Sequence, residues 1–235
     1  MRLDTYLVEN NLAMSRTKAQ SIIKSSLVSV NNKVVKKSAY QVEDEDRVEV
    51  LEHLEYVSRS AHKLKGFLDE LNLDIVDTVC LDIGASTGGF TQVLLEYGVK
   101  EVSAVDVGSK QLHEKIKNDQ RVFSYENCDI REFESEKVFD LVVSDVAFIS
   151  LLNILDTVDL LANDTIILLF KPQFEVGREA KRDKHGVVLD DKAIQEAMKK
   201  FEKASEDKGW DLILKSPSTL TGKEGNLEYC YCYKK

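Results

Sequence analysis

The sequence Val79-Cys-Leu-Asp-Ile-Gly-Ala-Ser-Thr-Gly-Gly-Phe-Thr91 decides the fold of this 235-residue chain. Its first five residues, Val79–Ile83, form an apolar run typical of a buried parallel strand. The run leads directly into Gly84, Gly88 and Gly89, and an amphipathic segment follows. A strand, a glycine-rich turn and a helix in this order indicate a Rossmann-like sheet that brings its backbone close to a nucleotide-containing ligand.

The neighbours of the turn indicate which ligand it binds. Ser86 stands where the second glycine of the dinucleotide fingerprint would be, which argues against NAD. Asp82, just before the turn, favours a ligand with a cationic amino-acid end. S-adenosylmethionine has such an end, and we expect it as the cofactor. Glycines suit the turn because a Cβ would block close contact or a positive φ.

From residue 79 onward, strand-like and helix-like segments alternate. This alternation predicts an α/β fold in which a mostly parallel sheet of seven strands has helices on both faces. No helical pattern separates the last two strands, so we expect them to pair antiparallel at the sheet edge. The predicted strands are 79–83, 101–106, 121–129, 139–145, 165–171, 210–216 and 226–233, with helices at about 59–72 and 190–208.

The N-terminal segment has a different pattern and predicts a small α+β domain. Helices are expected at 2–10 and 16–25, the second capped by Ser15. A strand, an Asn31-Asn32 turn and a second strand follow within 27–37, and another strand at 47–50. We therefore divide the chain into a first domain at 1–55, a linker at 56–62 and a second domain at 63–235.

Charge is sorted along the chain, although the net charge of −9 excludes a protein that is basic throughout. Between residues 14 and 37 there are six cations and no acid, which suits a surface for a phosphate backbone; the alternative is an ordinary solvated surface. These cations are Arg16, Lys18, Lys24, Lys33, Lys36 and Lys37.

Several classes of protein are disfavoured by composition. No apolar run approaches the ~20 residues that span a membrane, and early acids such as Asp4 argue against a signal peptide, so we expect a cytoplasmic protein. The four cysteines lack the CxxC spacing of a metal site and are interpreted as reduced thiols of the core, with no metal expected. They are Cys80, Cys128, Cys230 and Cys232.

Charged residues follow the predicted strands at the edge where open parallel sheets bind ligands. Asp106 lies 22 residues after Gly84, where an acid can accept hydrogen bonds from ribose hydroxyls, and Asp129 can meet an adenine amino group. Asp145 and Lys171 end two further strands. Strand-end solvation is the alternative for any one acid, but it explains a whole series of them poorly.

Three segments of the N-terminal domain resemble the S4 RNA-binding domain in order and spacing. They are Arg2-Leu-Asp-Thr-Tyr-Leu, Ser15-Arg-Thr-Lys-Ala-Gln-Ser-Ile-Ile and Val28-Ser-Val-Asn-Asn-Lys-Val-Val. The resemblance implies that this domain holds structured RNA. The candidate RNA contacts, which also include charged residues beyond this domain, are Arg16, Lys18, Lys33, Lys36, Arg59, Arg178 and Arg182.

Five further segments resemble the TlyA family of ribosomal RNA 2′-O-methyltransferases, also called haemolysins. They are Ser58-Arg-Ser-Ala-His-Lys-Leu, Leu81-Asp-Ile-Gly-Ala-Ser-Thr-Gly-Gly-Phe-Thr, Asp145-Val-Ala-Phe-Ile-Ser, Phe170-Lys-Pro-Gln-Phe-Glu and Gly225-Asn-Leu-Glu-Tyr. The family pairs an S4 domain with an FtsJ-like methyltransferase domain. The resemblance implies a catalytic tetrad of Lys63, Asp145, Lys171 and Glu228. It implies cofactor contacts at Asp82, Gly84, Ser86, Thr87, Gly88, Gly89, Phe90, Asp106 and Asp129.

The tetrad suits the chemistry that the resemblance implies. A ribose hydroxyl is a poor nucleophile, and a lysine can remove its proton or stabilise the developing alkoxide. We expect Lys171 near the hydroxyl and Asp145 orienting it, with Lys63 and Glu228 completing the network. Taken singly, Lys63 is more easily interpreted as a surface lysine and Glu228 as a solvent-facing residue of the last strand. Candidates for stacking on an exposed base are His62, Phe148 and Phe174.

Four interpretations are carried forward from the sequence. The first is methylation of a cytidine ribose by a monomer acting on ribosomal RNA or a ribosomal subunit, in 23S rather than 16S RNA because dual-substrate members are longer at their termini. The second is a methyltransferase for small molecules. The third is an RNA-binding ribosome-assembly protein without methyl transfer. The fourth is a membrane-active haemolysin, although no membrane-compatible segment is apparent.

Overall fold

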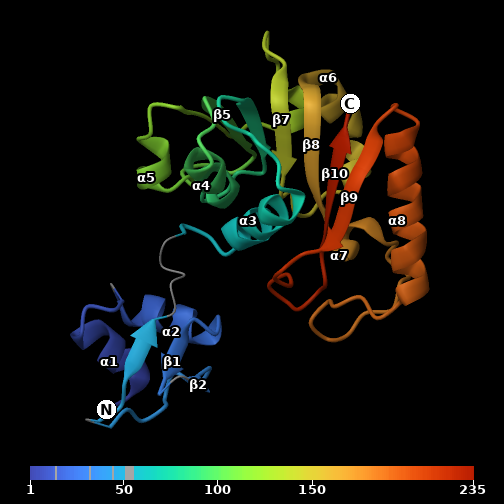
Figure 1. Ribbon diagram of the computed structural model, residues 1–235. Coiled ribbons are helices and arrows are strands. Elements are labelled where there is room, and N and C mark those ends of the chain that lie inside the picture. The colour runs from blue at the N-terminus through green and yellow to red at the C-terminus, as the bar shows by residue number, and fades with distance from the viewer. Residues whose placement is uncertain (14, 32, 44, 51–55) are drawn as a thin grey trace. The chain divides into compact units, whose positions relative to one another are not determined.

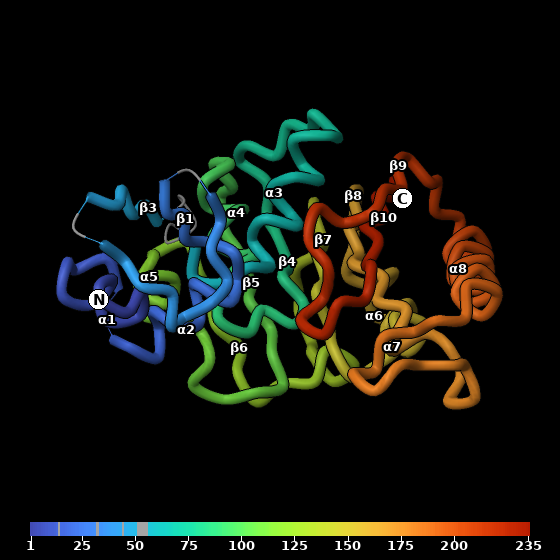
Figure 2. Tube along the Cα trace, turned by 90° about the horizontal axis from the view of Figure 1, so that it is seen from below, coloured from blue at the N-terminus to red at the C-terminus, as the bar shows by residue number. Residues whose placement is uncertain are grey.

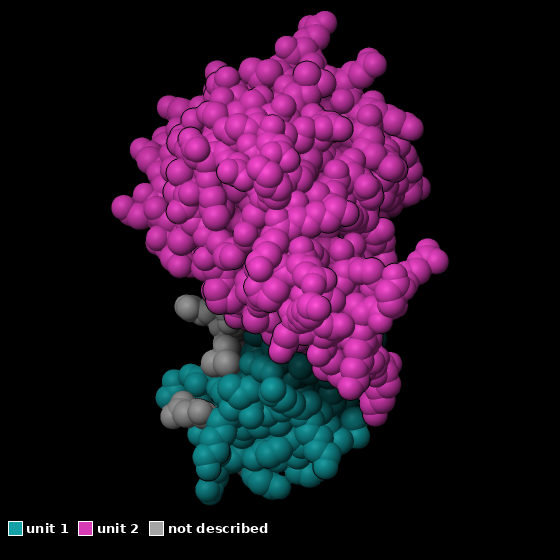
Figure 3. All heavy atoms as spheres, turned by 90° about the vertical axis from the view of Figure 1, so that its right-hand side faces the viewer, with its two compact units in different colours: residues 1–56 teal, residues 57–235 magenta. Residues whose placement is uncertain are grey.

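The computed structural model describes residues 1–13, 15–31, 33–43, 45–50 and 56–235. Contacts divide the chain into two compact units, Met1–Tyr56 and Val57–Lys235 (Figure 3). Each unit has a cluster of buried apolar side chains of its own. Separate cores are the expected property of two domains.

The first unit consists of two helices packed on a small antiparallel sheet (Figure 1). The helices are α1 (Leu3–Glu9) and α2 (Arg16–Lys24). Ser15 caps α2 by accepting a hydrogen bond from Lys18 N at 3.2 Å. The strand order is β2-β1-β3, with bounds of Lys33–Val34, Val28–Val30 and Val48–Val50. Both predicted helices and the hairpin are present, and Asn32 of the predicted turn lies outside the described residues.

The second unit contains a seven-stranded sheet in the order β6-β5-β4-β7-β8-β10-β9. The first five of these strands are parallel, and β10 is antiparallel to both of its neighbours. The predicted Rossmann-like sheet with an antiparallel pair at its edge is therefore confirmed. The strands are β4 (Val79–Ile83), β5 (Glu101–Asp106), β6 (Val122–Glu126), β7 (Phe139–Ser144), β8 (Ala162–Phe170), β9 (Asp211–Pro217) and β10 (Tyr229–Lys234).

Helices cover both faces of this sheet (Figure 2). On one face α3 (Ser60–Leu71) packs against α4 (Gly89–Glu96). The other face carries α6 (Leu155–Leu161) and α8 (Asp191–Glu206), whose apolar side chains share one core with those of the sheet. The short helices α5 (Glu114–Lys117) and α7 (Pro172–Glu175) follow β5 and β8.

Three predicted strands differ from the structure by three residues at one end, among them the fifth, which was expected from residue 165 but begins at Ala162 as β8. The third was expected at 121–129, but β6 ends at Glu126, because Asn127 has a positive φ of 55° and Asp129 begins a 3₁₀ turn. The last was expected from residue 226, but β10 begins at Tyr229. Glu228 therefore lies just before the strand, not within it, and its carbonyl accepts a hydrogen bond from Ser218 N.

The four cysteines are free thiols. Cys80, Cys230 and Cys232 are buried, whereas Cys128 is only half-buried, because β6 ends before it. Burial raises the pKa of the Cys80 thiol to about 12. Among the described residues, no helix has the length and apolar character that a membrane crossing requires.

Candidate active site

A cavity of about 1070 Å³ opens in the second unit where β4, β5, β7 and β8 end. Ligands of open parallel sheets bind at this edge. Most of the predicted site residues of this unit line the cavity. They are Gly84, Ser86, Phe90, Asp106, Asp129, Asp145, Phe148, Lys171, Phe174, Arg178 and Arg182.

The glycine turn after β4 makes room mainly for other parts of the protein. Gly84 has a φ of +80°, and a Cβ there would lie 3.2 Å from the backbone of Val146. Gly88 has a φ of +93°, and a Cβ there would lie 2.8 Å from Leu112 Cδ1. The lining of the cavity does not include the predicted cofactor contacts Thr87, Gly88 and Gly89.

Asp82 lies behind the turn and does not reach the cavity. Its side chain is fully buried, and its Oδ2 accepts a hydrogen bond from Thr91 Oγ1 at 2.6 Å. Its Oδ1 has no hydrogen-bond partner. Burial raises the pKa of this carboxyl group to about 7. The geometry therefore gives no direct contact between Asp82 and a ligand in the cavity.

The two other predicted cofactor acids lie on the cavity wall. Asp106 accepts hydrogen bonds from Ser86 N at 2.8 Å and Gly108 N at 2.7 Å, so its carboxylate ties β5 to the glycine turn. Asp129 pairs with Arg131 at 2.5 Å, which lowers the pKa of the Asp129 carboxyl group to about 2. Arg131 also lines the cavity and was not predicted from the sequence.

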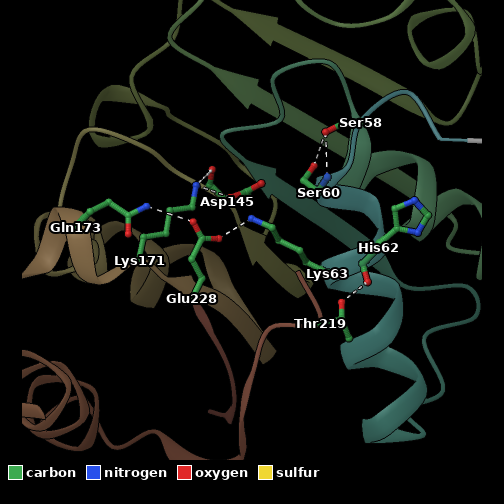
Figure 4. A network of polar contacts seen from close by, with 9 residues as sticks. All are labelled: Ser58, Ser60, His62, Lys63, Asp145, Lys171, Gln173, Thr219 and Glu228. Atoms are coloured by element: carbon green, nitrogen blue, oxygen red, sulfur yellow. Dashed lines mark hydrogen bonds and ion pairs between the residues drawn. The ribbon is translucent and has the colours of Figure 1, made fainter. Parts of the chain in front are cut away.

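The four residues of the predicted tetrad meet in the fold (Figure 4). Lys171 Nζ lies 2.6 Å from Asp145 Oδ1 and 3.2 Å from the Asp145 carbonyl oxygen. Lys63 Nζ donates to Glu228 Oε2 at 2.5 Å. Lys63 lies on α3, whereas Asp145 and Lys171 directly follow β7 and β8, and Glu228 directly precedes β10. Residues up to 165 positions apart are thus brought together.

The tetrad forms two ion pairs, and Gln173, a residue that was not predicted, contacts one of them. Gln173 Nε2 donates to Glu228 Oε1 at 3.2 Å, so both oxygens of Glu228 have a donor. Gln173, Asp145 and Lys171 line the cavity, whereas Lys63 is not part of its lining. Pro172 begins α7 and ends the strand, which leaves Lys171 at the rim. In the sequence, the position of Gln173 two residues after Lys171, within a segment that resembles the family, could have marked it as a site residue.

The predicted stacking residues differ in position. Phe148 is 92% exposed with a φ of +65°, and its ring centroid lies 5.2 Å from that of Phe174. Both line the cavity and offer it an apolar face. The ring of His62 points away from the tetrad in Figure 4, and its carbonyl oxygen accepts a hydrogen bond from Thr219.

The predicted RNA contacts of the second unit are not equivalent. Arg182 donates to the carbonyl oxygens of Gln173 and Gly177, both at 3.3 Å, and so braces the loop after α7. Arg178 lies on the same loop and is exposed. Arg59 is exposed just before α3.

In the first unit, a buried acid orders part of the cationic surface. Asp4 is fully buried and accepts hydrogen bonds from Arg2, Arg16 and Gln20, which hold the pKa of its carboxyl group well below the usual range. Arg16 remains 58% exposed. The other predicted contacts of this unit are exposed as well, namely Lys18, Lys33 and Lys36.

Comparisons with known proteins agree with this architecture. Residues 56–235 match the family described as FtsJ-like methyltransferase, and residues 1–48 match the S4 domain. The chain is 44% identical over 254 residues to the 23S rRNA (cytidine-2′-O)-methyltransferase TlyA of Campylobacter jejuni, covering 100% of both chains. It is 38% identical to the 16S/23S rRNA (cytidine-2′-O)-methyltransferase TlyA of Mycobacterium tuberculosis, covering 97% of this chain and 87% of that one.

Among solved structures, a Streptococcus thermophilus protein described as a hemolysin has a TM-score of 0.77 and 33% identity to this chain. The match covers 100% of this chain and 88% of that one. An S4 domain followed by an FtsJ-like methyltransferase domain, with full-length similarity to two TlyA enzymes, shows that the chain belongs to the TlyA family.

Proposed function

We propose that this protein transfers the methyl group of S-adenosylmethionine to the 2′-hydroxyl of a cytidine in 23S ribosomal RNA. The observation that carries the proposal is the meeting of Lys63, Asp145, Lys171 and Glu228 beside the cavity at the carboxyl edge of the sheet. The full-length similarity to a 23S rRNA (cytidine-2′-O)-methyltransferase supports this choice of substrate. We further propose that the protein acts on this substrate as a monomer in the cytoplasm.

The cavity suits the cofactor together with a target nucleotide. Its volume of about 1070 Å³ is slightly above the range for small-molecule sites, roughly 300–1,000 Å³. Asp106 and Asp129 on one wall offer carboxylate oxygens to ribose hydroxyls and an adenine amino group. Asp145 and Lys171 lie on another part of the lining. The adenosine end of the cofactor would thus bind near the acids, with its methyl group toward the lysine.

Lys171 is the residue that acts on the ribose hydroxyl in this proposal. Its ammonium group is held 2.6 Å from Asp145 Oδ1, so it has a defined position from which to contact the 2′-oxygen. The cofactor, when bound, would supply an electrophilic methyl group to the 2′-oxygen, and the electron pair of its carbon–sulfur bond would stay on sulfur. The hydroxyl proton would pass to the nitrogen of Lys171 as the ammonium group gives one of its own protons to the Asp145 carboxylate, so the proton ends on Asp145. Alignment of the hydroxyl with the methyl group supplies much of the acceleration, since such positioning replaces a bimolecular encounter.

Access to the ribose requires the target nucleotide to leave its helix or loop. The ring of Phe148 is almost fully exposed over the cavity and rests on Phe174, so it can stack on the base of an extruded cytidine. Exposed cations of the first unit, such as Arg16, Lys18 and Lys33, would hold the surrounding RNA by its phosphates.

Transfer to purified ribosomal RNA tests the proposal. The four substrates would be 23S RNA, 16S RNA and the two ribosomal subunits, all taken from cells that lack this protein. Each would be incubated with the protein and tritium-labelled cofactor, and the methylated ribose would be mapped by alkaline cleavage. We expect label on one cytidine of 23S RNA with the parent protein and none with Lys171→Ala. Cofactor binding without transfer to any of the four substrates would leave the RNA-binding assembly protein as the better interpretation.

A further inference from the structure

The segments that directly follow β7 and β8 are joined to each other at both of their ends. These two strands are neighbours in the sheet. Next to the strands, Lys171 Nζ lies 2.6 Å from Asp145 Oδ1. At the other end of the two segments, Ser150 Oγ donates to Glu175 Oε2 at 2.6 Å. The residues between these two contacts are therefore held from both sides.

Glu175 binds the segment after β7 with both of its carboxylate oxygens. Besides the hydrogen bond from Ser150, its Oε1 accepts one from Leu151 N at 2.8 Å. Glu175 is half-buried at the end of α7 and does not line the cavity, whereas Ser150 does. Leu151 is buried in the core of the second unit. The carboxylate therefore acts on a ligand in the cavity only through the segment that it holds.

Phe148 is the residue of that segment with the greatest need of support. Its φ of +65° is uncommon for a bulky side chain, and such a conformation costs free energy unless the surroundings impose it. Its ring is 92% exposed and lies against Phe174, so core packing does little to fix it. The backbone conformation that presents this ring to the cavity therefore depends on the contacts on either side of it.

From this arrangement we infer that Glu175 is a positioning residue, which holds Phe148 in place to stack on the base of the target nucleotide. The inference rests on the proposed function, since it concerns how the extruded cytidine of that reaction is placed. Without the carboxylate, Ser150 Oγ and Leu151 N lose their acceptor, and Phe148 can relax to a negative φ that moves its ring. The base would then lose part of its stacking, and the 2′-hydroxyl its alignment with Lys171.

A double-mutant cycle tests the assignment, because a residue that acts through Phe148 has nothing left to hold once that ring is removed. The quantity measured is kcat/KM for 23S RNA at saturating S-adenosylmethionine. We expect Phe148→Ala and Glu175→Ala each to lower it about tenfold, within the range for a lost contact between a base and an aromatic ring. In the Phe148→Ala protein, Glu175→Ala should lower it by less than about a further twofold.

Three further measurements separate positioning from a general loss of structure. Glu175→Gln keeps an acceptor for Leu151 N and offers an amide to Ser150 Oγ, so its kcat/KM for RNA should lie within about threefold of the parent value. Every variant should bind S-adenosylhomocysteine within about twofold of the parent affinity by calorimetry. The matched control is Glu70→Ala, which removes a carboxylate that accepts from Ser216 Oγ at 2.7 Å outside the cavity lining, and it should behave as the parent does.

The opposite results would overturn the inference. Equal losses from Glu175→Ala with and without Phe148 would mean that Glu175 acts independently of the ring, and weaker cofactor binding would mean that it supports the cavity as a whole. If Glu175→Ala does not fold, Ser150→Ala removes one of the two hydrogen bonds and should lower kcat/KM about threefold, with the same dependence on Phe148. A parent that methylates RNA while the losses of its variants add would overturn the inference alone. A parent that transfers no methyl group to RNA would overturn the proposed function as well.

Discussion

The two lysine–carboxylate pairs of the tetrad are similar in chemistry but differ in position. Lys171 and Asp145 have side chains that are 10% and 16% exposed, and both line the cavity. Lys63 and Glu228 are 9% and 2% exposed, and the cavity lining includes neither. The first pair can touch a bound substrate directly. The second pair can influence a bound substrate only indirectly, for example through Gln173, which binds Glu228 and lines the cavity.

The side chains of the buried pair are held in place by more contacts than those of the pair at the cavity. Lys63 and Gln173 each donate to one oxygen of Glu228. A Cβ at Gly222 would lie 2.5 Å from Glu228 Oε1, so a larger residue there would displace the carboxylate. Desolvating two charges is costly, and a hydrophobic pair of similar volume is often as stable. The position of this pair therefore suggests a role in fixing α3 and the loop before β10 around the cavity.

The largest effect is expected at the pair that lines the cavity. Lys171→Ala removes the group that we propose to contact the hydroxyl and should lower single-turnover methyl transfer about a thousandfold, within the range for a lost acid–base residue. Cofactor affinity should change little, because Asp106 and Asp129 remain. Lys199→Ala, on the exposed surface of α8, is the control. Transfer by Lys171→Ala within tenfold of the parent rate would show that the other pair carries the chemistry.

Breaking the buried pair should affect stability and activity together. Glu228→Gln keeps the shape of the side chain but leaves the buried Lys63 ammonium without a counter-charge. We expect the free energy of unfolding to fall by about 3 kcal/mol and methyl transfer by about a hundredfold. Urea unfolding and single-turnover rates at a temperature where the variant stays folded would separate the two losses.

Replacing both members of the buried pair sharpens the comparison. Lys63→Met/Glu228→Leu removes both charges and fills a similar volume, so its unfolding free energy should return to within about 1 kcal/mol of the parent value. Its methyl transfer should stay low, because the lost restraint on Gln173 is not restored. A double variant that is both stable and fully active would mean that the pair has no part in the reaction.

The comparison also explains what the sequence could predict. The sheet was predictable because its strands are apolar runs that end at Asp106, Asp145 and Lys171, and such runs carry their own signal. The meeting of Lys63 with Glu228 has no local signal, since it arises from the packing of α3 beside the start of β10. Only the resemblance to a family linked these two residues.

The remaining differences between the predicted and the observed site arise from hydrogen bonds within the protein. Arg131 reaches the cavity because Asp129 begins a turn instead of ending a strand, and nothing in the apolar pattern marks that change. Gln173 is a neutral residue in a charged network. Asp82 was expected at the ligand, but its Cβ points to the face of the sheet covered by α4, where Thr91 binds it.

A smaller effect than at either pair is expected at Gln173, which connects the buried pair to the cavity. Gln173→Leu removes the donor to Glu228 Oε1 and should lower methyl transfer about tenfold, since one hydrogen bond to a charged group is lost. The cofactor KM should stay near the parent value. Gln120→Ala, on the exposed surface, is the control. A change confined to the KM of the cofactor would assign Gln173 to cofactor binding instead of to positioning.

The smallest effect is expected at Asp82, a buried carboxyl group that forms no ion pair with a lysine and is bound by Thr91 instead. Burial raises the pKa of its side chain from 3.8 to about 7 in the folded protein. Between pH 4 and about 7 the unfolded chain therefore releases this proton while the folded chain keeps it, and the stabilisation present at low pH is lost as the pH rises through that window. Asp82→Asn keeps an acceptor for Thr91 and removes the titration.

The melting temperatures of the parent and of Asp82→Asn should therefore diverge as the pH rises from 5 to 8. We expect the variant to gain about 5 °C relative to the parent across this range. Asp156→Asn, at a position that is 99% exposed, should show no such gain. A parent that gains stability relative to Asp82→Asn as the pH rises from 5 to 8 would mean that the charged form of Asp82 is favoured in the fold. Asp82 would then have an unrecognised cationic partner, as the two lysine–carboxylate pairs do.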